Sequence, residues 1–156
     1  MADGTNTQLH QLGLKVNFKH TRVKLGEPVP AEVELVNQSP TKLLVNSRLG
    51  MGYPDSLDRE LYCDILLENG EPYTGYHAYM LDYRRKPLAD RFFTTLSPGE
   101  SVSSSFDLHE WYHLVQPGIY RIRVVYDPAT FATKPEAVSE TIISAPITLT
   151  VQPATG

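Results

Sequence analysis

Cysteine is almost absent from this 156-residue chain, in which Cys63 is the single example. One thiol cannot form a disulfide within the chain, and it cannot supply the ligand set of a cysteine-based zinc finger. Basic runs are absent too: 14 Lys and Arg are intermixed with 18 Asp and Glu, for a net charge of −4. No nucleic-acid partner is therefore expected. No apolar stretch approaches the roughly 20 residues of a membrane-spanning helix, so no membrane span is expected either.

The length and the first residues indicate how the chain is organised. A chain of 156 residues fits one domain, because domains commonly run to roughly 100–200 residues. We expect a single β-sandwich domain over residues 1–156, with flexible tails at 1–8 and 152–156. The first residues have neither the charged nor the apolar region of a signal peptide. The compartment stays open: extracellular if the chain is a mature fragment, cytoplasmic otherwise.

Alternation of apolar and polar side chains is the dominant pattern. It is typical of half-buried β-strands, in which successive side chains point to opposite faces. The long amphipathic helices that an α/β fold needs between its strands are absent. The sequence therefore predicts an all-β fold, an immunoglobulin-like Greek-key β-sandwich of about 7–9 strands with one short helix near 107–114. The clearest alternating segments are 12–18, 31–35, 43–45, 61–67, 102–108, 120–126 and 147–151.

Proline and glycine mark the turns between these strands. The pair Pro117-Gly118 followed by Tyr120 predicts a tyrosine corner, in which a phenol at the start of a strand bonds to the backbone just upstream. Three long loops are also expected. They should carry binding contacts, because binding residues concentrate on loops held by a rigid scaffold. These loops cover residues 47–60, 73–90 and 128–141.

Residues 109–113 match the pattern H-E-x-x-H. On a helix, His109 and His113 would share one face and could hold a zinc ion, and Glu110 could activate its bound water. Asp107 is suited to cap such a helix. A Pro-Gly pair soon ends it, however, and no histidine follows to serve as a third ligand. The favoured interpretation is a short polar helix with no metal, no cofactor and no catalytic residue; a zinc site on His109, Glu110 and His113 is the alternative.

Aromatic residues gather in the middle of the chain. Some of them must face the core, whereas exposed tyrosines would suit stacking on sugar rings or anchoring a protein partner. Two neighbouring arginines belong to a basic cluster that fits a solvated loop. Cys63 lies on an alternating apolar face and is interpreted as a small core residue. The candidate binding residues are Tyr73, Tyr76, Tyr79, Tyr83, Arg84 and Arg85.

The middle of the chain resembles a known family. Residues 68–76 read E-N-G-E-P-Y-T-G-Y, residues 93–102 read F-T-T-L-S-P-G-E-S-V, and residues 106–108, F-D-L, precede Tyr112. This order is similar to the immunoglobulin-like β-sandwich domain that precedes the catalytic domain in deuterolysin-type (aspzincin) metallopeptidases. The stretch L-x-P-G-E-S also occurs in other sandwich domains, including a bacterial intracellular proteinase-inhibitor family. The likeness covers residues 10–126.

The resemblance implies an accessory domain and not a protease. In that family the zinc-binding H-E-x-x-H belongs to a separate helical catalytic domain, which this sequence does not contain. The match at residues 109–113 falls inside the sandwich-like region, so the resemblance implies that it is accidental.

These observations favour a non-catalytic binding or accessory module that recognises a protein partner. A peptidase is one candidate partner, and protease inhibition is a specific form of this role. A zinc-dependent hydrolase and a carbohydrate-binding module that recognises a polysaccharide are the alternatives.

Overall fold

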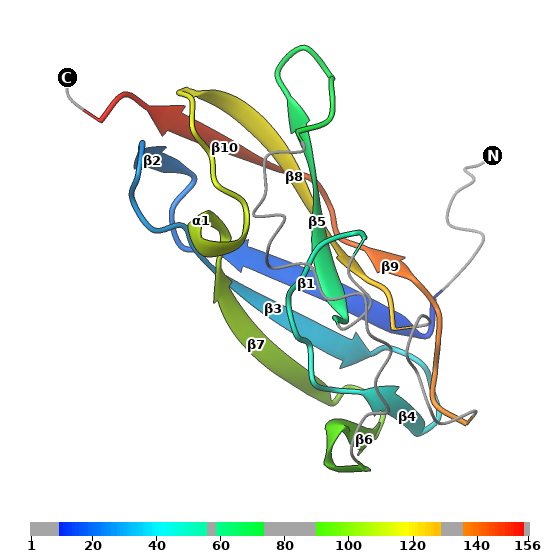
Figure 1. Ribbon diagram of the computed structural model, residues 1–156. Coiled ribbons are helices and arrows are strands. Elements are labelled where there is room, and N and C mark those ends of the chain that lie inside the picture. The colour runs from blue at the N-terminus through cyan, green and yellow to red at the C-terminus, as the bar shows by residue number, and fades with distance from the viewer. Residues whose placement is uncertain (1–9, 56–58, 74–89, 129–135, 155–156) are drawn as a thin grey trace.

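The computed structural model describes residues 10–55, 59–73, 90–128 and 136–154. Its strands form two main sheets and a small two-stranded pair, and helix is confined to short turns (Figure 1). The predicted all-β, immunoglobulin-like Greek-key sandwich is confirmed. In this described part, no helix is long and apolar enough to cross a membrane. The strands are β1 (Leu12–Phe18), β2 (Arg22–Lys24), β3 (Pro30–Asn37), β4 (Leu43–Asn46), β5 (Leu61–Leu67), β6 (Phe93–Leu96), β7 (Ser101–Asp107), β8 (Gly118–Tyr126), β9 (Ile142–Ile143) and β10 (Ile147–Gln152).

The first sheet, which we call sheet A, contains β1, β3 and β7 side by side, with β3 in the middle. Both pairings are antiparallel. Alternation along β3 buries Ala31, Val33 and Leu35, whereas Glu32 is exposed on the outer face. Val33 and Leu35 are completely buried, and burial of each such side chain contributes about 1.5–3 kcal/mol. Sheet A is therefore held to the core mainly through its central strand.

The second sheet, sheet B, has the order β2-β10-β8-β5, with β9 also paired to β8. The chain leaves sheet A after β1 and crosses to sheet B, where β2 runs parallel to β10. Strand β8 lies in the middle and buries Tyr120, Ile122 and Val124, while Arg121 and Arg123 point to solvent. This is the alternation expected of a strand with one face on the core.

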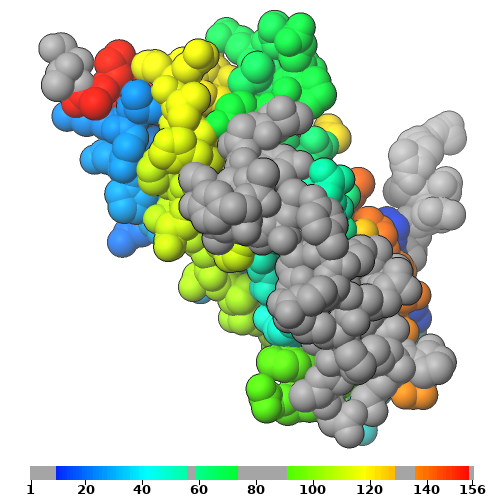
Figure 2. Space-filling model, viewed as in Figure 1, coloured from blue at the N-terminus to red at the C-terminus, as the bar shows by residue number. Residues whose placement is uncertain are grey.

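The predicted tyrosine corner is present at the start of β8. The Tyr120 hydroxyl donates a 2.6 Å hydrogen bond to the carbonyl of Gln116, four residues upstream. The turn after β5, at Asn69–Gly70, projects from one end of the molecule (Figure 2). The sequence pattern did not identify β2 and β9, which have only three and two residues, and it also missed the four-residue β6.

The short helix α1 covers Leu108–Trp111, inside the predicted range 107–114. Asp107 caps it as expected: its Oδ1 accepts hydrogen bonds from the backbone N–H of His109 at 3.0 Å and of Val29 at 2.8 Å. The helix ends because Tyr112 has an extended backbone, with φ −122° and ψ 103°. That conformation directs the Tyr112 ring into the core, where it is 1 % exposed. The predicted N-terminal tail, residues 1–8, lies outside the described residues.

Candidate functional site

The H-E-x-x-H segment does not lie on one helix. Helix α1 ends at Trp111, so His113 follows an extended residue and leaves the helical turn that carries His109. The two imidazole rings are nevertheless close, with centroids 5.2 Å apart and planes tilted by 34°. Glu110 is exposed. Within the described ranges, no group of three His, Cys, Asp or Glu side chains could hold a metal ion.

Tyr73 is used inside the fold. Its hydroxyl donates a hydrogen bond to the carbonyl of His113, and its ring packs edge-on against Tyr120 with centroids 5.8 Å apart. Burial raises the pKa of the Tyr73 phenol, and the neighbouring Tyr120 adds to this increase. These contacts engage the hydroxyl and one side of the ring, and the side chain as a whole is half-buried. The other candidate binding residues, Tyr76, Tyr79, Tyr83, Arg84 and Arg85, lie outside the described residues.

Cys63 is buried on the core face of β5, as its place in the alternation predicted. Burial raises the pKa of its thiol far above the usual range, and the nearby Asp64 carboxylate raises it further. A thiol must ionise to act as a nucleophile. The burial of Cys63 and the raised pKa of its thiol both fit its interpretation as a packing residue.

The structure brings together a different set of residues, at the far edge of sheet A. A hollow of about 500 Å³ lies between β7, the last residues of α1 and the loop that follows β4. Trp111 in its wall is half-buried, and its ring meets Tyr53 edge-on at 5.8 Å. We call this site the β7 hollow. The residues that define it are Arg48, Gly50, Met51, Ser105, Glu110 and Trp111.

A buried carboxylate holds one wall of the β7 hollow in place. Glu60 is completely buried, and its Oε1 accepts hydrogen bonds from Arg48 Nε at 2.8 Å and from the Gly50 N–H at 2.7 Å. Its Oε2 accepts a third bond from Asn46 Nδ2 at 3.2 Å. A buried charge is tolerated only with such partners. Three residues of the loop from Asn46 to Gly50 therefore bind the Glu60 carboxylate, and these hydrogen bonds restrict the loop's movement.

The same loop contains an unusual backbone conformation. Leu49 has φ 53°, a left-handed value that is costly for a residue with a branched side chain. A glycine at the next position avoids a tight contact, because a Cβ at Gly50 would lie 3.2 Å from Glu60 Oε1. Strain of this kind is kept where the surrounding contacts determine the conformation. Here the contacts to Glu60 do so, and they present Arg48 beside the hollow.

Among the described residues, the outer edge of β7 has no backbone partner, and Ser105 on this edge lines the β7 hollow. The N–H of Asn37 donates to the carbonyl of Glu100, so in this antiparallel register the even-numbered residues of β7 bond to β3. The odd-numbered residues Ser101, Ser103 and Ser105 therefore turn their N–H and C=O groups away from β3. No described residue supplies a backbone partner for them. A second chain could pair with these groups.

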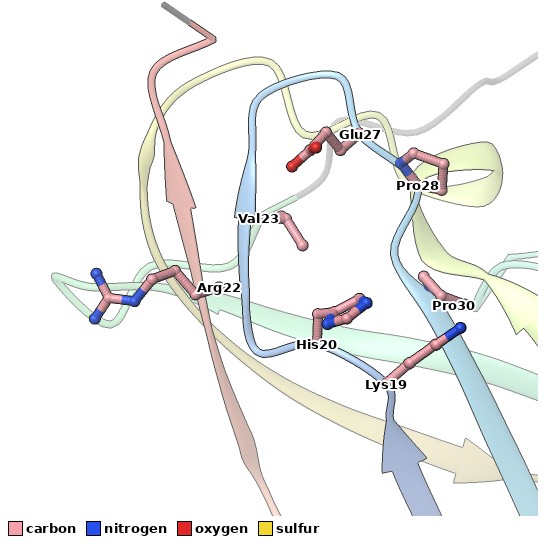
Figure 3. Close-up of a pocket in the computed structure, with 7 residues that line it drawn as sticks. All are labelled: Lys19, His20, Arg22, Val23, Glu27, Pro28 and Pro30. Carbon is pink, nitrogen blue, oxygen red and sulfur yellow. The ribbon is translucent and has the colours of Figure 1, made fainter. Parts of the chain in front are cut away.

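Other hollows do not assemble a comparable site. One of about 410 Å³ lies between the turn after β1 and the start of β3 (Figure 3). Lys19 and His20 reach its mouth, whereas Arg22 points away from it (Figure 3). Glu27 faces the same space, with Oε1 2.6 Å from the Lys24 N–H. Exposed side chains of both charges fix no particular ligand here.

Sequence reasoning missed the β7 hollow because the residues that define it come from two distant stretches of sequence, 48–51 and 105–111. The loop after β4 was expected to carry contacts, and the serines of β7 were recognisable as an exposed strand face. Nothing in the sequence shows that Glu60 folds that loop back towards β7. The short helix was expected to pack Trp111 or Leu114 inward, which gives no sign that Trp111 lines a hollow.

No protein-family model and no curated protein sequence matches the chain. Among solved structures, the chain is similar to a crystal structure of the CARDB domain of a Pyrococcus furiosus protein in complex with di-metal ions. The TM-score is 0.44 and the identity 15 %, over 94 % of this chain and 99 % of that one. A solution NMR structure of the same domain gives a TM-score of 0.43 at 15 % identity, over 91 % and 94 % of the two chains.

Proposed function

We propose that this chain is a non-catalytic binding module that recognises a protein partner at the β7 hollow. The observation that supports the proposal most directly is the unpaired backbone of Ser101, Ser103 and Ser105 beside a hollow walled by Trp111 and Arg48. An extended segment of a partner would add a strand to sheet A there, and main-chain hydrogen bonds would supply affinity. Tryptophan and arginine are the side chains most often found to dominate protein interfaces.

The rigid loop explains how specificity would arise. A partner strand paired with β7 directs alternate side chains to opposite faces of sheet A. Those on the inner face would enter the β7 hollow and contact Trp111. The loop held by Glu60 is already in place, so little conformational entropy would be lost on binding.

The resemblance to the accessory domain of deuterolysin-type peptidases makes peptidases the first class of partner to test. Binding without inhibition would support an accessory role, and inhibition would support the proteinase-inhibitor form of the proposal. In the carbohydrate-binding alternative, Tyr73 would offer only part of its ring for stacking, since its hydroxyl is bonded within the fold and its ring contacts Tyr120.

Selection from a displayed library of random linear peptides tests the proposal without a known partner. Wild-type protein is the bait, and Trp111→Ala and Ser103→Pro variants are the counter-baits. We expect selected peptides to bind the wild type at least about tenfold more tightly than either variant, which corresponds to about 1.4 kcal/mol. Peptides that bind all three proteins equally would remove the β7 hollow as the site.

The absence of catalysis is tested separately by metal analysis. The proposal assigns no reaction to His109, Glu110 or His113. Protein purified without chelator and then dialysed against zinc should retain far less than one equivalent. Stoichiometric zinc that is lost in a His109→Ala variant would instead support the hydrolase alternative.

A further inference from the structure

The opposite edge of sheet A, along β1, carries a second set of backbone groups that have no partner among the described residues. The Gln38 N–H donates to the Gln11 carbonyl, and the Lys19 N–H donates to the Pro30 carbonyl. These bonds fix which residues of β1 face β3: the odd-numbered ones, as in Lys15 opposite Glu34. Leu14, Val16 and Phe18 therefore direct their N–H and C=O groups outwards. No described residue pairs with these six groups.

Apolar side chains accompany this unpaired backbone. Leu14 and Val16 point to the inner face of sheet A, yet both remain partly exposed at its edge. Lys15 and Asn17 alternate with them on the outer face and are exposed. An unpaired strand edge with apolar side chains on one face is a template for another strand, and a single lysine is a common protection against indiscriminate pairing.

We propose that the β1 edge pairs with the β1 edge of a second copy of this chain. The strand is complementary to itself when it runs antiparallel with Val16 opposite Val16 of the second copy. Leu14 then lies opposite Phe18 of the second copy, and all six outward groups find partners. The three-stranded sheets A of the two copies become one continuous sheet.

The charges on the edge favour this register. Lys15 lies opposite Asn17 of the second copy, so the two lysines avoid each other. A shift of the centre to Lys15 would place the two lysines directly opposite one another, which is unfavourable. It would also place the odd-numbered groups, which bond to β3, at the centre of the new pairing.

The two ends of β1 carry opposite charges. At the start of β1, Glu140 Oε1 accepts a 2.9 Å hydrogen bond from the Leu12 N–H, and His10 Nδ1 lies 3.8 Å from its Oε2. Just past the end of β1, Lys19 and His20 are exposed (Figure 3). Antiparallel pairing brings the acidic end of one copy beside the basic end of the other. Such complementarity steers association and fixes the register.

This inference is independent of the function proposed at the β7 hollow, which lies on the other edge of the same sheet. A dimer formed through β1 leaves both β7 edges exposed. Each dimer would therefore present two copies of the binding site.

Sedimentation velocity from micromolar to millimolar concentration tests the inference. Wild-type protein should shift from the monomer of 17.5 kDa towards twice that mass. Val16→Pro should remain monomeric, with the dissociation constant raised roughly tenfold or more, because it removes an outward N–H that β3 does not use. Ser103→Pro is the matched control: it removes an outward N–H on β7 and should dimerise like the wild type.

Two variants at Asn17 that change its charge test the register of β1 on β1 of the second copy. They avoid the effect of a proline substitution on the fold of the monomer. Asn17→Lys places lysines opposite each other and should weaken the dimer several-fold, whereas Asn17→Glu should tighten it several-fold. Thermal unfolding of each variant at low concentration reports whether the monomer is intact. A wild type that stays monomeric to millimolar concentration would overturn the inference. So would a dimer that responds equally to Val16→Pro and Ser103→Pro.

Discussion

The edge strand β5 of sheet B and the edge strands of sheet A differ in how many of their outward backbone groups are hydrogen-bonded. At the outer edge of β5, the Leu61 N–H bonds to the Gly50 carbonyl and the Leu61 carbonyl accepts from Gly52. The Cys63 N–H donates to the Tyr112 hydroxyl at 2.9 Å. Further along, the carbonyl of Ile65 accepts a bond from the Tyr73 N–H. Only the Cys63 carbonyl and the Ile65 N–H lack a partner among the described residues, a gap too short for another strand.

At β1 the described residues leave three consecutive outward positions unpaired, and β7 does the same. Natural sandwiches protect their edges against chance pairing. The closed β5 edge uses a loop, a buried tyrosine and a following turn for this purpose. The contrast shows that this fold can bond the outward backbone groups of an edge strand within the chain. The edges of sheet A, where the described residues leave such groups unbonded, are therefore the candidate surfaces for binding another chain.

The largest expected effect comes from removing the support of the β5 edge. Glu60→Ala leaves Arg48 and the Gly50 N–H without their buried partner, and Gly50 is one of the residues that cover Leu61. Loss of one member of a buried ion pair costs about 3–5 kcal/mol. Urea unfolding should show a decrease of this size in the free energy of unfolding. The exposed Glu68→Ala is the control, expected within about 0.5 kcal/mol of wild type.

Two neighbouring proline variants sharpen the comparison within β1 itself. Lys15→Pro removes an N–H that bonds to β3 and leaves the Glu34 carbonyl without its partner, which should cost about 1–3 kcal/mol. Val16→Pro removes an outward N–H, which an edge strand tolerates, so the monomer should lose less than about 1 kcal/mol. Urea unfolding at low protein concentration gives the free energy of unfolding of each variant as a monomer. Equal losses, or the reverse order, would show that the register of β1 on β3 is wrong.

Tyr112→Phe removes the hydroxyl that pairs with one outward backbone N–H of β5, that of Cys63. The hydroxyl accepts from the Cys63 N–H and donates to the carbonyl of Gly52 at 3.1 Å. Its loss leaves two buried backbone groups unsatisfied, at a cost of about 1–3 kcal/mol. Tyr62→Phe, whose hydroxyl the described residues leave without a partner, should be nearly neutral. If both variants unfold alike, the Tyr112 hydroxyl has no part in closing this edge.

The smallest effect concerns alkaline pH. Burial raises the pKa of both the Cys63 thiol and the Tyr126 phenol, so the folded state holds these protons more tightly than the unfolded state. Stability is therefore unaffected below the ordinary thiol pKa of about 8.5 and falls above it, by about 1.4 kcal/mol per pH unit for one group. Urea unfolding at pH 8 and pH 10 should show this decrease. In the Cys63→Ala variant the free energy of unfolding should fall less between pH 8 and pH 10. A decrease equal to that of the wild type would mean that the thiol is not buried.

The sequence predicted the long strands well because each has a pattern of its own. Residues 61–67 and 120–126 alternate clearly, and the structure places β5 and β8 there. The tyrosine corner and the Asp107 cap were also recognisable, since both depend on neighbours in sequence. Short strands such as β2 were not predicted, because three residues are too few to show the alternation of apolar and polar side chains.

The candidate site was harder to predict, for a physical reason. Trp111, Arg48 and the serines of β7 meet only after Glu60 has folded the loop before β5 against sheet A. Edge pairing depends on register, and register is settled by contacts between strands distant in sequence. The alternation along residues 12–18 shows which side chains point inwards, but it does not show which backbone groups remain unpaired.

Amide hydrogen exchange resolved by residue, at low and high protein concentration, tests the contrast between the edges most directly. The Cys63 and Lys15 amides should exchange slowly at both concentrations, because each has a partner within its own chain. The Val16 amide should exchange rapidly in dilute solution and slowly at high concentration, where a second copy covers it. Protection of Val16 at every concentration, or at none, would contradict the account.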